Sequence, residues 1–140
     1  MAIEIITYGM LEGSGKVWVD EQEARIRRET TKWLALVLIG LVSPIALSFL
    51  RMETQDPALW FQRSGSIMVV LALLAELRVV IIDRLIIARD HSFLYCHMYI
   101  ENKYQAKLRV INYVTYFVVA VGTLVWGFGD VFYANIVLAK

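Results

Sequence analysis

The stretch WFQRSGSIMVVLALLAELRVVIIDRLIIAR, from Trp60 to Arg89, decides the fold of this chain. It holds thirty residues without a proline, and as a helix it would be about 45 Å long at about 1.5 Å per residue. That length exceeds the roughly 30 Å hydrocarbon core of a bilayer. Residues 64–75 are almost purely apolar, whereas charges follow among Val, Ile and Leu. We therefore predict a membrane helix with a charged inner third.

The composition of the whole chain also indicates a membrane protein. Hydrophobic residues make up 59% of the 140 residues, charged residues make up 19%, and the mean hydropathy is +0.58. Soluble domains are typically about 45–50% apolar. A net charge of +1 gives no basic field that would attract nucleic acid, and we expect no direct sequence-specific binding of it. The single cysteine, Cys96, excludes an intrachain disulfide.

Two more apolar stretches flank the central one, so we predict an all-α membrane protein with three transmembrane helices. The expected spans are about 33–50, 60–82 and 108–127. In the first, Ser43-Pro44 interrupts the hydrogen-bond ladder, where we expect a kink. The hydrocarbon register of the second stays open, because residues 59–77 and 64–82 both fit. We expect a break at residues 126–130 and an interfacial tail at 131–140, which is too short to span.

The N-terminal residues 1–32 are predicted to form a separate cytoplasmic segment before the membrane domain, residues 33–140. Residues 1–11 alternate in part, which is typical of either a short strand or a frayed tail. The Gly-Ser-Gly sequence at 13–15 indicates a hinge, and Asp20 is a candidate helix cap.

The distribution of positive charge predicts the orientation. Residues 1–32 hold five Lys or Arg and residues 84–109 hold five more, while the opposite side holds Arg51, Arg63 and Lys140. Positive residues accumulate on the cytoplasmic side of membrane proteins. We therefore expect a multi-pass protein of the bacterial inner membrane with a cytoplasmic N-terminus.

Ionisable residues in the inner part of the second span are the leading candidates for a functional site, because charge within a membrane is costly and usually faces protein or water. Residues two positions apart on a helix are separated by about 200° around its axis. Glu76 and Arg78 therefore cannot share a face, and each needs its own partner. The functional interpretation is a water-lined seam inside an oligomer, and the alternative is an ion-pair network that fixes helix register. The predicted seam consists of Glu76, Arg78, Asp83, Arg84 and, from the third span, Arg109.

Small residues indicate where helices pack closely, and we expect them to serve a homo-oligomer. The predicted packing residues are Gly40, Ser43, Ser64, Gly65 and Gly122.

Arg63 lies just inside the outer end of the second span. Snorkelling toward headgroups explains it without a function, and the alternatives are a pore mouth or a contact with lipid phosphate.

We expect no enzymatic activity, metal or cofactor. His91, Cys96 and His97 are residue types that bind zinc, but their spacing matches no zinc motif. The chain contains no Ser-His-Asp spacing, phosphate loop or HExxH motif.

Two segments, FQRSGS at Phe61–Ser66 and GTLVWGFGD at Gly122–Asp130, carry a resemblance to a known family. With the spacing of the spans, they resemble small bacterial membrane proteins linked to antiphage defence, especially retron-associated transmembrane effectors. The resemblance covers residues 33–130. It implies a toxin held silent by a reverse transcriptase and its DNA–RNA product, which damages the inner membrane when infection disturbs that complex. The resemblance implies no catalytic residues that could be assigned to positions in this sequence.

Three hypotheses about function follow. The first is a membrane effector of an abortive-infection system that forms an oligomeric pore or leak. The second is a membrane anchor or scaffold for a cytoplasmic partner. The third is a small transporter subunit in which Glu76 carries protons, which would require a pKa near neutrality.

Overall fold

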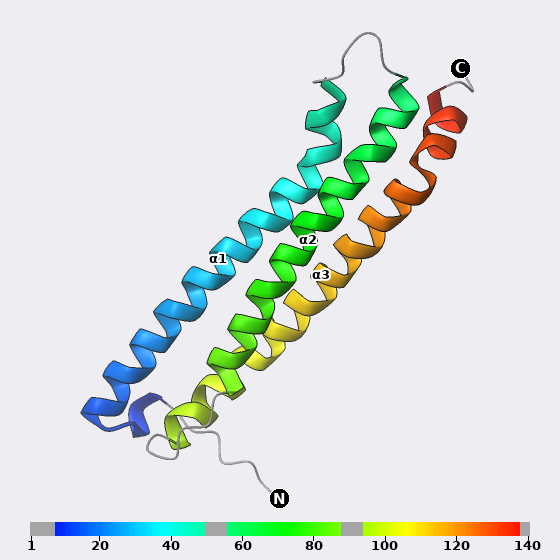
Figure 1. Cartoon of the computed structure of the whole chain (residues 1–140). Coiled ribbons are helices and arrows are strands. Elements are labelled where there is room, and N and C mark those ends of the chain that lie inside the picture. The colour runs from blue at the N-terminus through cyan, green and yellow to red at the C-terminus, as the bar shows by residue number, and fades with distance from the viewer. Residues whose placement is uncertain (1–7, 50–55, 88–93, 138–140) are drawn as a thin grey trace, which may run out of the picture.

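The computed structural model describes residues 8–49, 56–87 and 94–137, apart from some side chains within them. It contains a short 3-10 helix, η1 (Tyr8–Met10), and three long helices, α1 (Gly13–Phe49), α2 (Pro57–Ile87) and α3 (Leu94–Val137). The long helices lie side by side in an up-down-up order, with α2 between α1 and α3 (Figure 1). The described ranges contain no strand. We call the end that holds the start of α1 the inner end and the opposite end the outer end.

Each long helix exceeds the thickness of a bilayer. The helices α1, α2 and α3 contain 37, 31 and 44 residues. At about 1.5 Å per residue these are rods of about 55, 46 and 66 Å. All three are apolar enough to cross a membrane. For the described residues, the prediction of an all-helical chain with three helices long and apolar enough to span a membrane is confirmed, and these helices suggest a multi-pass membrane protein.

The core is a narrow apolar stripe on each helix. On α2 the buried positions recur at alternating spacings of four and three residues. This is the mean spacing of 3.5 residues that produces coiled-coil packing. The outward faces carry large exposed apolar side chains, such as Val70, Leu73 and Leu77, which suits a surface covered by lipid. The buried stripe on α2 consists of Met68, Ala72, Ala75, Val79, Ile82 and Ile86.

The N-terminal part is more helical than predicted. Because α1 begins at Gly13, residues 13–15 form its first turn and not a hinge. The start is stabilised by packing on α3, where a Cβ on Gly15 would lie only 3.0 Å from the Cys96 sulfur. Asp20 lies inside α1 and does not cap it. Its carboxylate accepts hydrogen bonds of 3.0 and 3.1 Å from the Tyr8 hydroxyl.

The helix α1 runs through Lys32 and Trp33 without interruption, so no break in the helix marks the predicted boundary between residues 32 and 33. Residues 8–10 of the predicted strand form η1. The rest of that predicted strand, residues 1–7, lies outside the described residues.

The predicted break in the third span does not occur. The helix α3 continues through residues 126–130 to Val137, so residues 131–137 extend the helix and are not a separate interfacial segment. A glycine costs about 1 kcal/mol relative to alanine in a helix. However, Gly129 lies where a Cβ would be 3.0 Å from the Cα of Gln62 on α2. The close contact between helices outweighs the low helix propensity.

Pro44 lies within α1, and the helix continues past it to Phe49. Proline has no N–H, so the carbonyl of Gly40 loses its usual donor. The Ser43 hydroxyl replaces that donor with a hydrogen bond of 2.7 Å to the Gly40 carbonyl. This matters in lipid, where no water is present to satisfy a free backbone group.

Glycines bring the backbones of α2 and α3 into close contact. A Cβ on Gly65 would lie 2.5 Å from the Trp126 backbone nitrogen and 2.9 Å from the Gly122 carbonyl oxygen. A Cβ on Gly122 would lie 3.0 Å from a methyl carbon of Val69. The small residues proposed for helix packing are all buried within one chain; they are Gly40, Ser43, Ser64, Gly65 and Gly122. Their faces are therefore occupied before any second subunit binds.

Substituting Gly65→Ala should lower the stability of the protein by about 1–3 kcal/mol, the usual cost of an overpacked site. The added methyl group would push the Trp126 backbone away and separate α2 from α3. The measurement is unfolding of the purified protein in detergent, followed by circular dichroism. Gly127→Ala is the matched control, because a Cβ there meets nothing within 4 Å. Equal stability of the two variants would contradict the role assigned to Gly65.

Candidate functional site

Glu29 is the centre of a charged cluster on α1 and α2. Its side chain is 8% exposed, and its carboxylate lies 2.7 Å from Lys32 Nζ and 3.3 Å from Arg78 Nη1. Arg28 Nε is 3.7 Å away. Arg78 comes from α2, so its ion pair with Glu29 joins two helices. One carboxylate shared by three cations leaves a local surplus of positive charge.

The structure brings only part of the predicted charged seam together. Among the described residues, Arg78 is the member of the seam that forms an ion pair, and its partner is Glu29. Glu76 and Asp83 are half-buried beside the apolar stripe of α2. Arg84 and Arg109 are exposed. The ion pairs between described residues do not link these four side chains to one another.

At the inner end, polar contacts hold α3 against α1. The Lys103 ammonium donates hydrogen bonds of 2.5 Å to Glu23 and 3.1 Å to the Tyr99 hydroxyl. The Glu23 carboxylate holds the pKa of the Lys103 ammonium above its ordinary value. Further along the bundle, the Trp33 indole donates a hydrogen bond of 2.9 Å to the Thr115 hydroxyl. These contacts fix the level of α1 relative to α3.

Two of the residues considered as zinc ligands, Cys96 and His97, lie in the packed inner end. His97 is buried, and its ring meets Trp18 edge-on at 4.5 Å between centroids. Cys96 is buried next to Gly15, with its sulfur 3.8 Å from the Gly15 carbonyl oxygen. His91 lies outside the described residues. Within the described parts of the chain, His, Cys, Asp and Glu form no group of three or more that could hold a metal ion.

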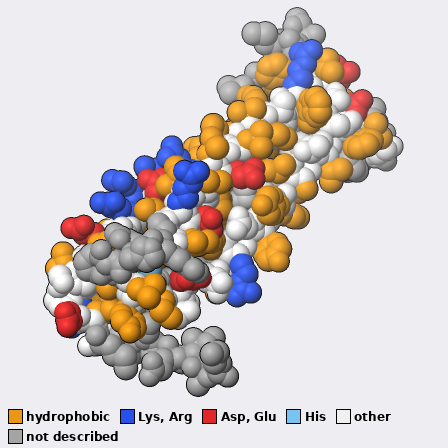
Figure 2. All heavy atoms as spheres, turned by 60° about the horizontal axis from the view of Figure 1, so that its bottom comes forward, with side chains coloured by type: hydrophobic (Ala, Val, Ile, Leu, Met, Phe, Trp, Pro, Cys, Tyr) orange, Lys and Arg blue, Asp and Glu red, His pale blue; other side chains and the backbone are white. Residues whose placement is uncertain are grey.

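The charged parts of α1 and α2 end at one common level, and the charged part of α3 ends further inward, because Arg109 lies six residues, or about 9 Å of helix, before Thr115. The Glu29–Arg78 contact aligns α1 with α2, and the Trp33–Thr115 contact aligns α1 with α3. Charged side chains are frequent toward the inner end, and apolar side chains dominate the middle of the bundle (Figure 2). The last charged positions before the apolar zone are Lys32 on α1, Glu76 on α2 and Arg109 on α3.

The level at which the charged parts of α1 and α2 end indicates which residues of the second span lie in the hydrocarbon core. From Asp56 to Glu76 there are twenty residues, or about 30 Å of helix, which equals the thickness of the hydrocarbon core. Arg63 is the charged residue between them. The geometry therefore favours the register 59–77, with Glu76 at the inner interface. The segment 79–87 of α2 then extends beyond the lipid.

The two segments that carry the family resemblance pack against each other at the outer end. Gly65 in the first touches Trp126 in the second, and Gln62 in the first touches Gly129 in the second. Beside this junction is a pocket of about 370 Å³. It is lined by Leu59, Gln62, Arg63, Trp126 and Gly127.

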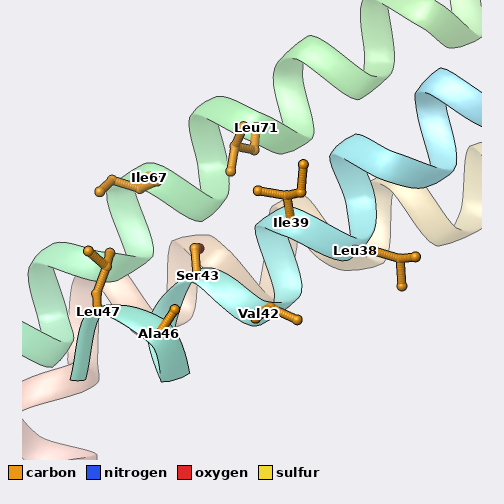
Figure 3. A pocket seen from close by; sticks show the side chains of 8 residues that line it. All are labelled: Leu38, Ile39, Val42, Ser43, Ala46, Leu47, Ile67 and Leu71. Carbon is orange, nitrogen blue, oxygen red and sulfur yellow. The ribbon is translucent and has the colours of Figure 1, made fainter. Parts of the chain in front are cut away.

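A second hollow, of about 450 Å³, lies between α1 and α2 in the apolar zone. The side chains of Ile39 and Ser43 point toward Ile67 and Leu71 across it (Figure 3). Its lining is apolar except for Ser43, whose hydroxyl is bonded to the Gly40 carbonyl. This groove is suited to apolar packing and offers no reactive group.

The sequence pattern did not identify Glu29, because it lies in a run of charges of both signs, residues 20–32, that is typical of an exposed helix. The available signal was its position four residues before Trp33, where the charged run meets the apolar span. Gly129 was read as part of a helix break, although it lies seven residues after Gly122 on the same helix face.

Comparisons with known proteins add no relative. No protein-family model matches the chain, and neither the curated proteins nor the solved structures gave a match.

Substituting Glu29→Gln should destabilise the protein by about 1–3 kcal/mol, since hydrogen bonds to charged groups contribute about that much. The variant removes the negative charge that holds three cations together. The measurement is denaturant unfolding in detergent, with the exposed Glu21→Gln as control. Combining Glu29→Gln with Arg78→Gln should cost less than the sum of the two single changes. Additive effects would show that the two side chains do not interact.

Proposed function

We propose that this protein is a membrane effector of a bacterial antiphage system of the retron-like, abortive-infection type. The observation that carries the proposal is the contact between the two segments with the family resemblance. Residues 61–66 and 122–130 are far apart in sequence, yet they form one junction through Gly65 and Trp126. Both segments lie at the outer ends of adjacent antiparallel helices, so the fold brings them together (Figure 1). This contact supports treating them as a single functional unit.

The proposed effector is silent as a single chain. The buried stripe of α2 is apolar and faces neighbouring helices, so this stripe offers no polar path for ions within the described part of one chain. A leak through the membrane requires several chains or a rearranged bundle. The glycine faces are already used within the chain, so assembly would proceed through the outward faces of the helices. The half-buried Glu76 would border the path that opens.

The charged inner end is the proposed site of control. With the membrane at the favoured register, residues 13–32 of α1 extend about 30 Å beyond the lipid. In the predicted orientation this extension lies in the cytoplasm. It would receive the inhibitor, which the resemblance suggests is a reverse transcriptase with its DNA–RNA product. Infection would release that inhibitor and allow assembly in the inner membrane.

The same extension favours a second candidate function, a membrane anchor for a cytoplasmic partner. Exposed charges such as Arg25 and Arg27 give the extension a surface suited to protein binding. The ion pairs Glu29–Arg78 and Glu23–Lys103 hold it rigid. In this function the spans only fix position, and the membrane stays intact.

Induction of the wild-type protein together with its trigger should depolarise the cell, as measured with a voltage-sensitive dye. Glu76→Ala should reduce the depolarisation, because the proposed leak passes this side chain. Glu101→Ala is the matched control, since Glu101 is also half-buried but lies on α3 in the charged inner part. A membrane potential that the wild-type protein leaves unchanged under every trigger would refute the effector function.

Charge reversal at Arg25 and Arg27 separates the two candidate functions. If the inner end binds an inhibitor, Arg25→Glu with Arg27→Glu should weaken co-purification of the partner and increase depolarisation. If the protein is an anchor, the same variant should lose the partner without any change in membrane potential. Exposed Asp130→Asn, at the outer end, serves as the control and should retain the partner.

A further inference from the structure

The pocket beside Arg63 has a charge and a chemistry that suit a particular ligand. Among its lining residues, Arg63 is the charged one, Gln62 and Trp126 have polar N–H groups, and Leu59 is apolar. Arg63 is exposed and forms no ion pair with another described residue. A guanidinium group without a carboxylate partner, next to other hydrogen-bond donors, favours an oxyanion with several acceptor oxygens.

The depth of the pocket in the membrane identifies the source of such an oxyanion. Arg63 lies seven residues, or about 10 Å of helix, below Asp56. A long arginine side chain at this depth reaches up to the headgroup level. Tryptophans mark the interface between lipid and water. Trp126 lines the pocket, and the nearby Trp60 donates a hydrogen bond of 2.6 Å to the Leu47 carbonyl at the outer end of α1.

We propose that this pocket binds one anionic phospholipid of the outer-end leaflet through its phosphodiester group. The Arg63 guanidinium holds the phosphate oxygens, the Gln62 amide and Trp126 indole donate to the phosphate and glycerol oxygens, and Leu59 contacts the start of an acyl chain. The positive charge of the lining selects headgroups with a net negative charge. The proposed lipid site is compatible with both candidate functions, effector and anchor, because it depends only on the residues that line the pocket.

The glycines of α3 explain why the pocket exists. A Cβ on Gly127 meets nothing within 4 Å, so the missing side chain leaves open space beside Arg63. By contrast, a Cβ on Gly65 or on Gly129 would meet the backbone of the neighbouring helix. A large side chain at Gly127 would therefore occupy the pocket without disturbing the contact between α2 and α3.

The test measures lipid binding to the full-length protein in detergent by native mass spectrometry. Wild-type protein should bind phosphatidylglycerol more tightly than phosphatidylcholine. Arg63→Gln should weaken phosphatidylglycerol binding by about tenfold or more, because a charge-assisted hydrogen bond typically contributes at least one decade of affinity. Gly127→Leu should weaken it similarly by filling the pocket. Arg84→Gln, an exposed arginine at the inner end, should bind like wild type.

Circular dichroism establishes that each variant is folded, and the exposed Arg63→Gln decides the result if Gly127→Leu does not fold. Inorganic phosphate added as a competitor separates a lipid site from a free-phosphate site, and it should not displace the lipid. The proposal is overturned if Arg63→Gln binds phosphatidylglycerol as wild type does, or if Arg84→Gln loses as much affinity. Displacement by inorganic phosphate, or equal binding of phosphatidylcholine, would likewise overturn it.

Discussion

Close backbone contact between α2 and α3 is the constraint on which the rest of the bundle depends. In lipid the hydrophobic effect does not drive helices together, because acyl chains are as apolar as leucine. Association relies on van der Waals packing, which requires the surfaces to fit closely. Gly65 lies against the backbone of Trp126 and Gly122, and Gly129 lies against Gln62. These contacts align the outer halves of the two helices and thereby form the pocket at Arg63.

Several buried polar groups of the bundle are paired at successive levels along its length. In the apolar zone, the Ser43 hydroxyl supports the carbonyl that Pro44 leaves without a donor, and the Trp33 indole is bonded to Thr115. At the edge of that zone, Glu29 is surrounded by cations. An unpaired polar group in a dry interior is costly, so the two contacts that join helices, Trp33–Thr115 and Glu29–Arg78, also specify helix register. With the register 59–77 for the second span, the level at which ion pairs replace apolar packing would correspond to the edge of the lipid.

The two ends of the bundle therefore differ in chemistry. The inner end is charged and held together by ion pairs, which suits contact with a soluble partner. The outer end combines aromatic residues, glycines and Arg63, which suits contact with lipid headgroups. The middle offers an apolar groove between α1 and α2. The proposed effector, which would link events in the cytoplasm to the state of the membrane, would use both ends.

The amino-acid sequence by itself determined that three apolar helices exist, that the middle one is longer than a bilayer is thick, and which small residues pack. Length and hydropathy are local properties, and a segment such as residues 64–75 has few alternatives to a helix in lipid. Only the tertiary structure decided that Glu29 is the partner of Arg78, that α3 continues through Gly127 and Gly129, and that two distant motifs form one junction. Those outcomes depend on which helix faces meet, and the periodicity of one helix does not specify its neighbour.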